Sequence, residues 1–178
     1  GRYDINANFM FMMDNLMDLT HLGYVHNSTI GGNPDQHDEA PITTTKTEKG
    51  AHFIRWMLDS VPPPSFVSVG GFEGNIDRWS DFEYVGPSSV LQWGGALPVG
   101  KNAQKNRLQK DALSLRLFHH ATPKCDDKFH YFFSVGIEGF DADSPGSQQF
   151  YKDILEAFLE DKLFIESQQY GVARDPSR

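Results

Sequence analysis

The sequence has too little cysteine for a disulfide framework or a cysteine-rich metal cluster. Its single cysteine, Cys125, excludes an internal disulfide and any zinc cluster built on two or four cysteines of this chain. The sequence also has no apolar run of about 20 residues, the length of a membrane-spanning helix, and no recognisable signal peptide. We therefore predict a cytoplasmic protein without a membrane partner.

Basic residues are scarce as well. Lys and Arg number 16 against 24 Asp and Glu, which gives a net charge of −8. Nucleic acids and anionic membrane surfaces require clustered positive charge. The basic cluster from Lys101 to Lys110 is interpreted as an exposed, solvated connection, a docking patch being the alternative. The charge argues against a nucleic-acid partner, and 178 residues are enough for one domain with a core.

The side chains that can bind a metal are most concentrated between Asp14 and His26. On a helix, Asp14, Asp18 and His21 stand at i, i+4 and i+7 and share one face, with Asn15 at its border. Most other positions are apolar: Phe9, Met10, Met12, Met13, Leu16, Met17 and Leu19. A helix that is apolar all round is buried, and buried polar groups need partners. This polar stripe therefore indicates a binding site.

His26 follows His21 at i+5, about 140° round a continuous helix, so the two imidazoles converge only if the backbone changes course between them. Gly23 stands between them and is the residue at which we expect the helix to break. The resulting motif, Asp-x2-His-x4-His, lacks the glutamate and the i,i+4 histidine pair of His-Glu-x-x-His zinc proteases.

Six segments between residues 42 and 137 have the branched, aromatic or alternating character of strands and are bounded by Gly, Pro, Asn or Asp. They cover residues 42–49, 51–58, 78–85, 90–96, 112–121 and 128–137. Residues 31–41 and 62–74 are expected to be loops. Together the strands predict an antiparallel meander, followed by a long helix over about residues 147–169 with a start signal at Ser144.

Asp161 lies on the apolar face of that second helix. The apolar positions are Phe150, Ile154, Ala157, Phe158 and Ile165. Position 161 is only about 20° from position 150 on the helical wheel, so the carboxylate is directed into the core. A buried carboxylate needs a cation, hydrogen-bond donors or a metal. A salt bridge is therefore the alternative to a metal site.

Two imidazoles and one carboxylate on one face of a metal, with the opposite face open, are typical of non-haem Fe(II) oxygenases. We predict that His21, His26 and Asp161 bind Fe(II) and leave positions for O2 and substrate. Asp18, one turn before His21, is expected to accept a hydrogen bond from the imidazole nitrogen that faces away from the metal. Asn15 is expected to line the pocket, with an amide bonded to backbone as the alternative.

The sequence from Asn8 to His26, together with Phe158-Leu-Glu-Asp-Lys162, resembles the catalytic domain of Rieske non-haem iron aromatic-ring oxygenases. The resemblance is to the vanillate O-demethylase and dicamba monooxygenase branch. It spans most of the chain, with a weaker anchor at residues 130–133. It implies His21, His26 and Asp161 as iron ligands, and Asp18 as the bridge that conducts electrons from a neighbouring subunit's Rieske cluster.

The resemblance also implies an α+β fold of the helix-grip (START-like) type, in which a curved antiparallel sheet surrounds a long C-terminal helix. Gln92 and His119, on successive strands, fall roughly where related enzymes place polar substrate contacts. His119 and His120 face opposite sides of a strand, so only one of them can enter the pocket. The implied substrate is an aromatic compound, often carboxylated, that undergoes hydroxylation, dihydroxylation or oxidative O-demethylation.

Four aromatic residues are candidates either for lining such a cavity or for plain core: Phe53, Trp56, Trp93 and Phe132.

Members of this family carry a [2Fe–2S] Rieske domain with Cys-x-His and Cys-x-x-His motifs, and this chain has neither. We expect residues 1–178 to be a single catalytic mononuclear-iron domain. Because the chain starts at Gly1 and not at Met, we interpret it as excised from a longer protein, a naturally shortened protein being the alternative. The implied partners are a Rieske domain, a reductase or ferredoxin, and a head-to-tail homotrimer, with a monomer as the alternative for the isolated domain.

Two other functions fit the same residues. One is a helix-grip module that binds a small molecule without catalytic metal, in which His21, His26 and Asp161 form a buried polar network. The other is a zinc-dependent hydrolase with the same three ligands. Stoichiometric iron would separate the oxygenase from the metal-free module.

Overall fold

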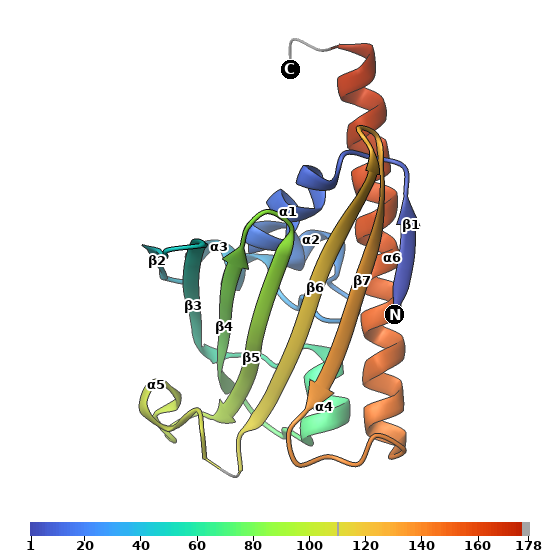
Figure 1. Ribbon diagram of the computed structural model, residues 1–178. Coiled ribbons are helices and arrows are strands. Elements are labelled where there is room, and N and C mark those ends of the chain that lie inside the picture. Colours follow the sequence, from blue (N-terminus) through green and yellow to red (C-terminus); the bar gives the residue numbers. More distant parts are fainter. Residues whose placement is uncertain (110, 176–178) are drawn as a thin grey trace.

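The computed structural model describes residues 1–109 and 111–175, which form one curved sheet wrapped around a long helix (Figure 1). The strands are β1 (Arg2–Ile5), β2 (Ile42–Lys46), β3 (Gly50–Ser60), β4 (Ile76–Val85), β5 (Ser89–Pro98), β6 (Leu113–Cys125) and β7 (Lys128–Ile137). The helical elements are α1 (Phe9–Met17), the 3-10 turn η1 (Leu19–His21), α2 (Leu22–Val25), α3 (Pro34–Glu39), α4 (Pro64–Gly70), α5 (Ala103–Asn106) and α6 (Pro145–Arg174).

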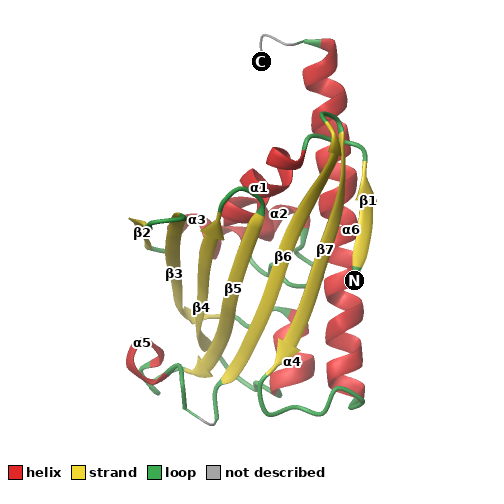
Figure 2. Cartoon of the chain, in the orientation of Figure 1, coloured by secondary structure: helices red, strands yellow, loops and turns green. Residues whose placement is uncertain are grey.

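The sheet is antiparallel throughout, in the order β1-β7-β6-β5-β4-β3-β2. Six of its strands follow one another in sequence, so the predicted meander is confirmed. Figure 2 shows the sheet as one layer, with α1 to α4 and α6 behind it. The α+β helix-grip architecture is therefore confirmed. None of the described helices combines the length and apolar content needed to cross a membrane.

The core lies between the inner face of the sheet and α6. Alternate residues of β6 and β7 point inward, and α6 supplies the opposing side chains. The buried members are Leu113, Leu115, Leu117, Ala121, Phe129, Tyr131, Phe133, Phe150, Ile154, Ala157, Phe158 and Ile165. Burial of each large side chain contributes about 1.5–3 kcal/mol, so the contact between sheet and helix fixes the position of α6.

Helix α6 begins as the sequence predicts and ends later. The Ser144 hydroxyl accepts a hydrogen bond from the Ser147 backbone amide, and Pro145 occupies the first turn. The helix continues to Arg174, beyond the expected end near residue 169, because its last turn is exposed and adds no buried residue to the apolar face.

Two segments that the sequence analysis assigned to loops contain short helices, so that assignment is wrong for α3 and α4. Helix α3 begins after Asn33, whose side chain accepts from the Asp35 amide, and α4 ends at Gly71 in the left-handed conformation (φ 64°). Proline and glycine in these segments mark helix ends as well as turns. Strand β1 was not predicted either, and it pairs with β7 at the sheet edge.

Three of the four aromatic residues that were candidates for lining a cavity lie on the outer face of the sheet. Phe53 belongs to the core on the inner face, where it stacks on Phe82. Trp56, Trp93 and Phe132 occupy strand positions on the outer face, so the expectation that they line a cavity between sheet and helix is wrong. The predicted basic connection contains the short helix α5 and is otherwise mostly exposed, and Lys110 lies outside the described residues.

Two buried side chains, Arg78 and His37, hold the loop after α2 in place, and we call them the clamp. Arg78 on β4 donates to the carbonyl oxygens of Ile30 and Gly31, at 3.0 Å each, and His37 Nε2 donates to the same Gly31 oxygen at 2.8 Å. A Cβ at Gly31 would lie 2.0 Å from the Leu22 carbonyl oxygen, so only glycine allows this close approach. Burial, and then the charge of Arg78, lower the pKa of His37 to about 4.

The His37 clamp predicts how stability responds to pH. His37 titrates near pH 6.5 in the unfolded chain and near 4 in the folded one, so the unfolded state binds the extra proton between these values. The contribution of neutral His37 to the free energy of unfolding is therefore fully present above pH 6.5. It is lost as the pH falls, and at pH 4.5 the free energy of unfolding is lower by on the order of 2 kcal/mol. Urea unfolding of the wild type and of His37→Gln between pH 4.5 and 7.5 measures this difference.

Other titrating groups are common to both proteins and cancel in the comparison. Equal pH slopes for wild type and His37→Gln would show that His37 is not held neutral in the folded protein.

Candidate metal centre

The backbone of the N-terminal segment bends at Asp18, five residues before the expected position. Helix α1 ends at Met17, and Asp18 is extended (φ −119°, ψ 104°). The Asp18 carboxylate accepts hydrogen bonds from the Thr20 amide at 3.0 Å and the Thr20 hydroxyl at 2.8 Å. Such a local cap competes with the helix, which then restarts as η1 and α2. The predicted break at Gly23 is wrong, since Gly23 lies inside α2.

This bend brings the two histidines together. His21 ends η1, and His26 caps the C-terminus of α2. Their rings lie 5.3 Å apart between centroids at an interplanar angle of 78°. The prediction that Asp14, Asp18 and His21 share one continuous helix face is wrong, because the chain leaves the helix at Asp18.

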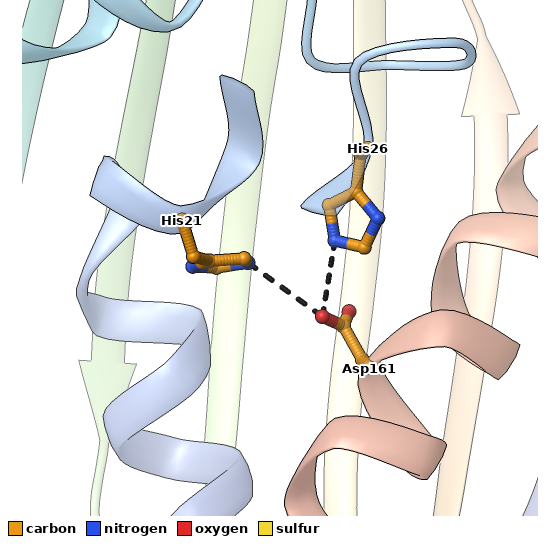
Figure 3. Close-up of side chains that lie close together, drawn as sticks. All are labelled: His21, His26 and Asp161. Carbon is orange, nitrogen blue, oxygen red and sulfur yellow. Dashed lines mark hydrogen bonds and ion pairs between the residues drawn. The ribbon is translucent and has the colours of Figure 1, made fainter. Parts of the chain in front are cut away.

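Asp161 reaches the histidines from α6, at the centre of the apolar face, as the helical wheel predicts. It is 4% exposed. Its Oδ1 lies 3.0 Å from His26 Nε2 and 3.6 Å from His21 Nε2 (Figure 3). One ligand atom from each of the three residues can be chosen so that all lie within 4.8 Å of one another. The fold therefore brings the three predicted ligands to one place.

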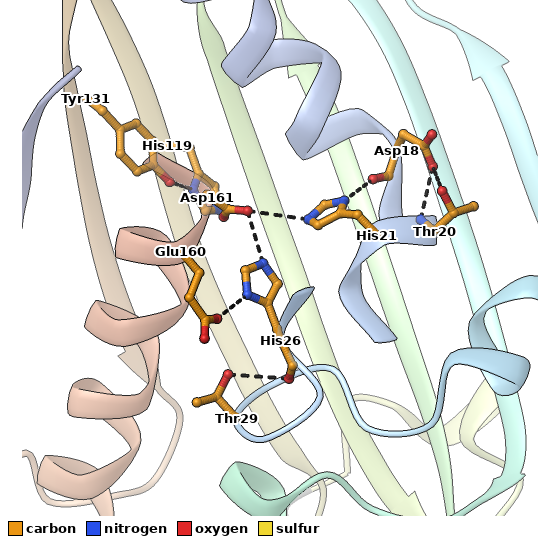
Figure 4. A network of polar contacts seen from close by, with 9 residues as sticks. All are labelled: Asp18, Thr20, His21, His26, Thr29, His119, Tyr131, Glu160 and Asp161. Carbon is orange, nitrogen blue, oxygen red and sulfur yellow. Dashed lines mark hydrogen bonds and ion pairs between the residues drawn. The ribbon is translucent and has the colours of Figure 1, made fainter. Parts of the chain in front are cut away.

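The Nδ1 atoms of His21 and His26 form hydrogen bonds that orient both Nε2 atoms toward Asp161 (Figure 4). His21 Nδ1 donates to the Asp18 backbone carbonyl at 2.6 Å, and His26 Nδ1 donates to Glu160 Oε2 at 2.7 Å. A hydrogen bond at the far nitrogen fixes the ring orientation of a metal-binding histidine. The sequence analysis missed Glu160, although its position next to Asp161 on α6 was a usable signal.

The expected role of the Asp18 side chain at His21 is corrected by this geometry. The acceptor for His21 Nδ1 is the main-chain oxygen of Asp18, and the carboxylate is used to cap Thr20. Asp18 is exposed, whereas His21 is half-buried. Asp18 therefore connects the surface to a histidine of the site through its backbone.

The electrostatics of the two histidines differ. Burial lowers the pKa of His21 and outweighs the opposing charge of Asp161. For His26, burial also lowers the pKa, but hydrogen bonds to Asp161 and Glu160 more than offset it, so the net shift is upward. Without a metal, a proton on His26 Nε2 satisfies Asp161; a metal ion would take the place of that proton.

A small cavity adjoins the three residues, and three of the other predicted site residues line it, whereas Asp18 does not. Its polar lining includes Asn15, Gln92 and His119. Asn15 Nδ2 has no hydrogen-bond partner among the described residues, as expected of a group available to a ligand.

His119 lies on the inner face of β6, and His120 lies on the outer face, where it contacts Ser89. His119 Nε2 donates to Gln92 Oε1 at 3.0 Å, while Nδ1 accepts from the Tyr131 hydroxyl at 2.6 Å. Burial lowers the pKa of His119 to about 4, which keeps the ring neutral. Both ring nitrogens are thus occupied, and the Gln92 amide nitrogen remains as a donor to the cavity.

The donor set fits a divalent metal. Two imidazole nitrogens and one carboxylate oxygen suit Fe(II) and Zn(II), and the small cavity adjoins this group. The side chains that complete this compartment are apolar: Leu16, Leu19, Leu22, Ile30, Phe82 and Phe158. A metal held here would therefore face an apolar pocket with few polar groups.

Comparison with known proteins places this site in a family. The family model of the vanillate O-demethylase oxygenase C-terminal domain matches residues 5–178. The toluene-4-sulfonate monooxygenase system iron-sulfur subunit TsaM1 of Comamonas testosteroni is 29% identical over 180 residues, covering 100% of this chain and 52% of that protein. The vanillate O-demethylase oxygenase subunit of a Pseudomonas sp. is 30% identical over 185 residues, covering 100% of this chain and 51% of that protein.

The fold of this chain is also similar to that of a solved oxygenase. A crystal structure of dicamba monooxygenase bound to 3,6-dichlorosalicylic acid superposes with a TM-score of 0.86 at 21% identity, covering 100% of this chain and 52% of that one. The chain spans about half the length of the relatives it matches. The resemblance to the vanillate and dicamba branch of Rieske oxygenases is confirmed, and the chain belongs to the family of vanillate O-demethylase oxygenase C-terminal domains.

Proposed function

We propose that residues 1–178 are the catalytic domain of a Rieske-type oxygenase. In this proposal His21, His26 and Asp161 hold one mononuclear Fe(II), and an aromatic substrate is hydroxylated or oxidatively O-demethylated with O2. The observation that carries the proposal is the meeting of three ligand atoms within 4.8 Å at the wall of an apolar cavity. When bound, the iron supplies the centre at which O2 is activated.

The protein's own residues hold the substrate and exclude water. Leu19, Ile30 and Phe158 form apolar walls around the metal group, and a ring stacked among them is kept away from bulk solvent. Asn15 and the Gln92 amide offer hydrogen-bond donors to a polar substituent. His119, held neutral and fixed by Tyr131, orients Gln92.

Electrons have to come from outside this chain, because one cysteine cannot ligate a [2Fe–2S] cluster. We propose that a Rieske domain, which receives its electrons from a reductase or ferredoxin, docks near Asp18. Asp18 is exposed, and its backbone carbonyl accepts a hydrogen bond from His21. A head-to-tail homotrimer would place the Rieske domain of one subunit beside Asp18 of the next. This assembly is part of the proposal, as is a cytoplasmic location.

A metal-free binding module is the second candidate. It is favoured by the hydrogen bonding of His26, whose two ring nitrogens contact Glu160 and Asp161 and so form a network that is satisfied without metal. The metal content of the purified protein separates the two functions.

Anaerobic reconstitution with Fe(II) tests the proposed function. We expect one iron per chain in the wild type, and little or none in His26→Ala and Asp161→Ala, because each removes one of three ligands. Elemental analysis after desalting measures the content, and His120→Ala, which removes a histidine from the outer face, should retain iron. Absence of iron from the wild type, or iron that is indifferent to both substitutions, would favour the binding module.

Glu160 should tune the metal site without binding the metal. Glu160→Gln weakens the hydrogen bond that orients His26, so we expect roughly a 10- to 100-fold loss of metal affinity. Chelator competition with Fe(II) measures this loss. Glu156→Gln, an exposed position one turn earlier on α6, is the matched control. Equal affinities for Glu160→Gln and the control would remove Glu160 from the site.

Asp18→Asn tests the route of the electrons. Asparagine is as good a helix cap as aspartate, so we expect the bend, the carbonyl contact with His21 and the iron content to be retained. The substitution removes only the exposed negative charge at the proposed docking position of the Rieske domain. Turnover driven by a reductase and a Rieske protein supplied in trans should fall strongly, whereas peroxide-driven turnover of the iron-loaded domain should be preserved. A parallel loss in both assays would mean that Asp18 acts on the metal site and not on electron delivery.

A further inference from the structure

Among the residues that the structure describes, Arg78 is a buried cation without an anionic partner. It lies on the inner face of β4 and is 8% exposed. Two carbonyl oxygens, those of Ile30 and Gly31, accept hydrogen bonds from its guanidinium, and its Nε has no partner in the part of the chain that the structure describes. Within residues 1–109 and 111–175 no carboxylate forms an ion pair with it.

Burying a charge in this way is costly. A guanidinium loses much of its hydration when buried, and neutral carbonyls offset only part of that loss. Burial, and then the nearby Arg55, lower the pKa of Arg78 to about 10, so it remains a cation at neutral pH. Since the whole chain has a net charge of −8, a buried cation without an acidic partner is unexpected. An anionic ligand would supply the missing partner.

Arg78 lines a cavity that adjoins the metal compartment. The compartment beside Arg78 also contains Phe66 and Ser80, and the guanidinium lies 4.8 Å from the Phe66 ring centroid. It shares six lining residues with the compartment of His21, His26 and Asp161: Leu19, Leu22, Ile30, Phe82, Gln92 and Phe158. The metal group and Arg78 therefore line two neighbouring compartments with a mostly apolar boundary between them, and we call the two compartments together the passage.

The spacing and the polarity of the two compartments favour a ring with an acidic substituent. Arg78 and Phe82 are four residues apart on β4, about 13 Å along the strand, and the long arginine side chain spans part of that distance. The two compartments have volumes of about 50 and 40 Å3, so a ring must displace side chains at their shared boundary when it enters. The boundary is mostly apolar, which favours an uncharged ring between two polar ends.

We propose that Arg78 is the specificity-determining residue of the substrate site, which takes an aromatic oxyacid with its carboxylate or sulfonate at Arg78 and its opposite edge toward His21, His26 and Asp161. The Nε–H, which has no partner among the described residues, and a second N–H of one Nη match two oxygens of such a group. The orientation of the ring toward the metal rests on the proposed function, whereas recognition of the anion does not require a metal.

Arg55 provides a matched control. It lies on the inner face of β3, is 6% exposed, and has unpartnered Nε and Nη1 atoms among the described residues, as Arg78 has an unpartnered Nε. The charges that act on it are those of Asp18 and Asp38. It lines neither compartment of the passage. Replacing Arg55 therefore removes a buried cation without touching the proposed anion site.

The test is calorimetric titration of metal-free protein with benzoate, benzenesulfonate and the neutral benzamide. Working without metal prevents a carboxylate from binding directly to iron. We expect the wild type and Arg55→Gln to prefer both acids over benzamide. In Arg78→Gln, affinity for the acids should fall roughly 10- to 100-fold while that for benzamide changes by less than about threefold.

Arg78 also holds the carbonyls of Ile30 and Gly31, so Arg78→Gln can lose ligand binding because the loop no longer keeps its conformation. Arg78→Lys retains the charge and one donor to the loop. It should still prefer the acids over benzamide, but bind them more weakly than the wild type does because the fork is lost. Thermal unfolding of each variant identifies those that fold.

No preference for acids in the wild type, or a preference unchanged in a folded Arg78 variant, would overturn the proposal. Iron loading of the same proteins is measured separately. Iron bound without anion preference would refute the role of Arg78 alone, and anion preference without iron would refute the oxygenase alone.

Discussion

The burial of the Asp161 carboxylate against two imidazoles is the interaction on which the rest of the structure depends. Asp161 lies on the core face of α6, where an unpaired carboxylate would be strongly destabilising. Its partners His21 and His26 come from a segment at the other end of the chain, 135 residues away in the case of His26. The N-terminal helices and the C-terminal helix therefore have to dock in one register for the core to form.

That docking explains why the site has so little freedom. The ring of His21 is fixed by the Asp18 carbonyl, and that of His26 by Glu160. Phe158, one turn before Asp161 on α6, packs edge-on against Tyr131, Phe133 and His119. The three candidate ligands His21, His26 and Asp161 are thus positioned by the same contacts that stabilise the core, which is the arrangement expected of a preorganised site.

The second polar feature of the interior is connected to the first through the loop after α2. Arg78 and His37 bind the Ile30 and Gly31 carbonyls a few residues after His26. Ile30 in turn lines both compartments of the passage. Arg78 therefore holds the loop that follows His26, and a residue of that loop separates the two compartments.

The sequence by itself determined the periodic features and predicted which three residues, His21, His26 and Asp161, would form a candidate metal site. Alternating apolar residues gave the strands of the meander, and the position of Asp161 on the wheel of α6 placed a carboxylate in the core, because these patterns depend only on local backbone geometry. Tertiary structure decided what local geometry leaves open. The bend falls at Asp18 and not at Gly23, because a side-chain cap on Thr20 ended the helix. Glu160 and Arg78 acquired their contacts from segments distant in sequence, which no local pattern encodes. Trp56, Trp93 and Phe132 lie on the outer face, because the pairing of strands, and not their composition, fixes which side of the sheet faces α6.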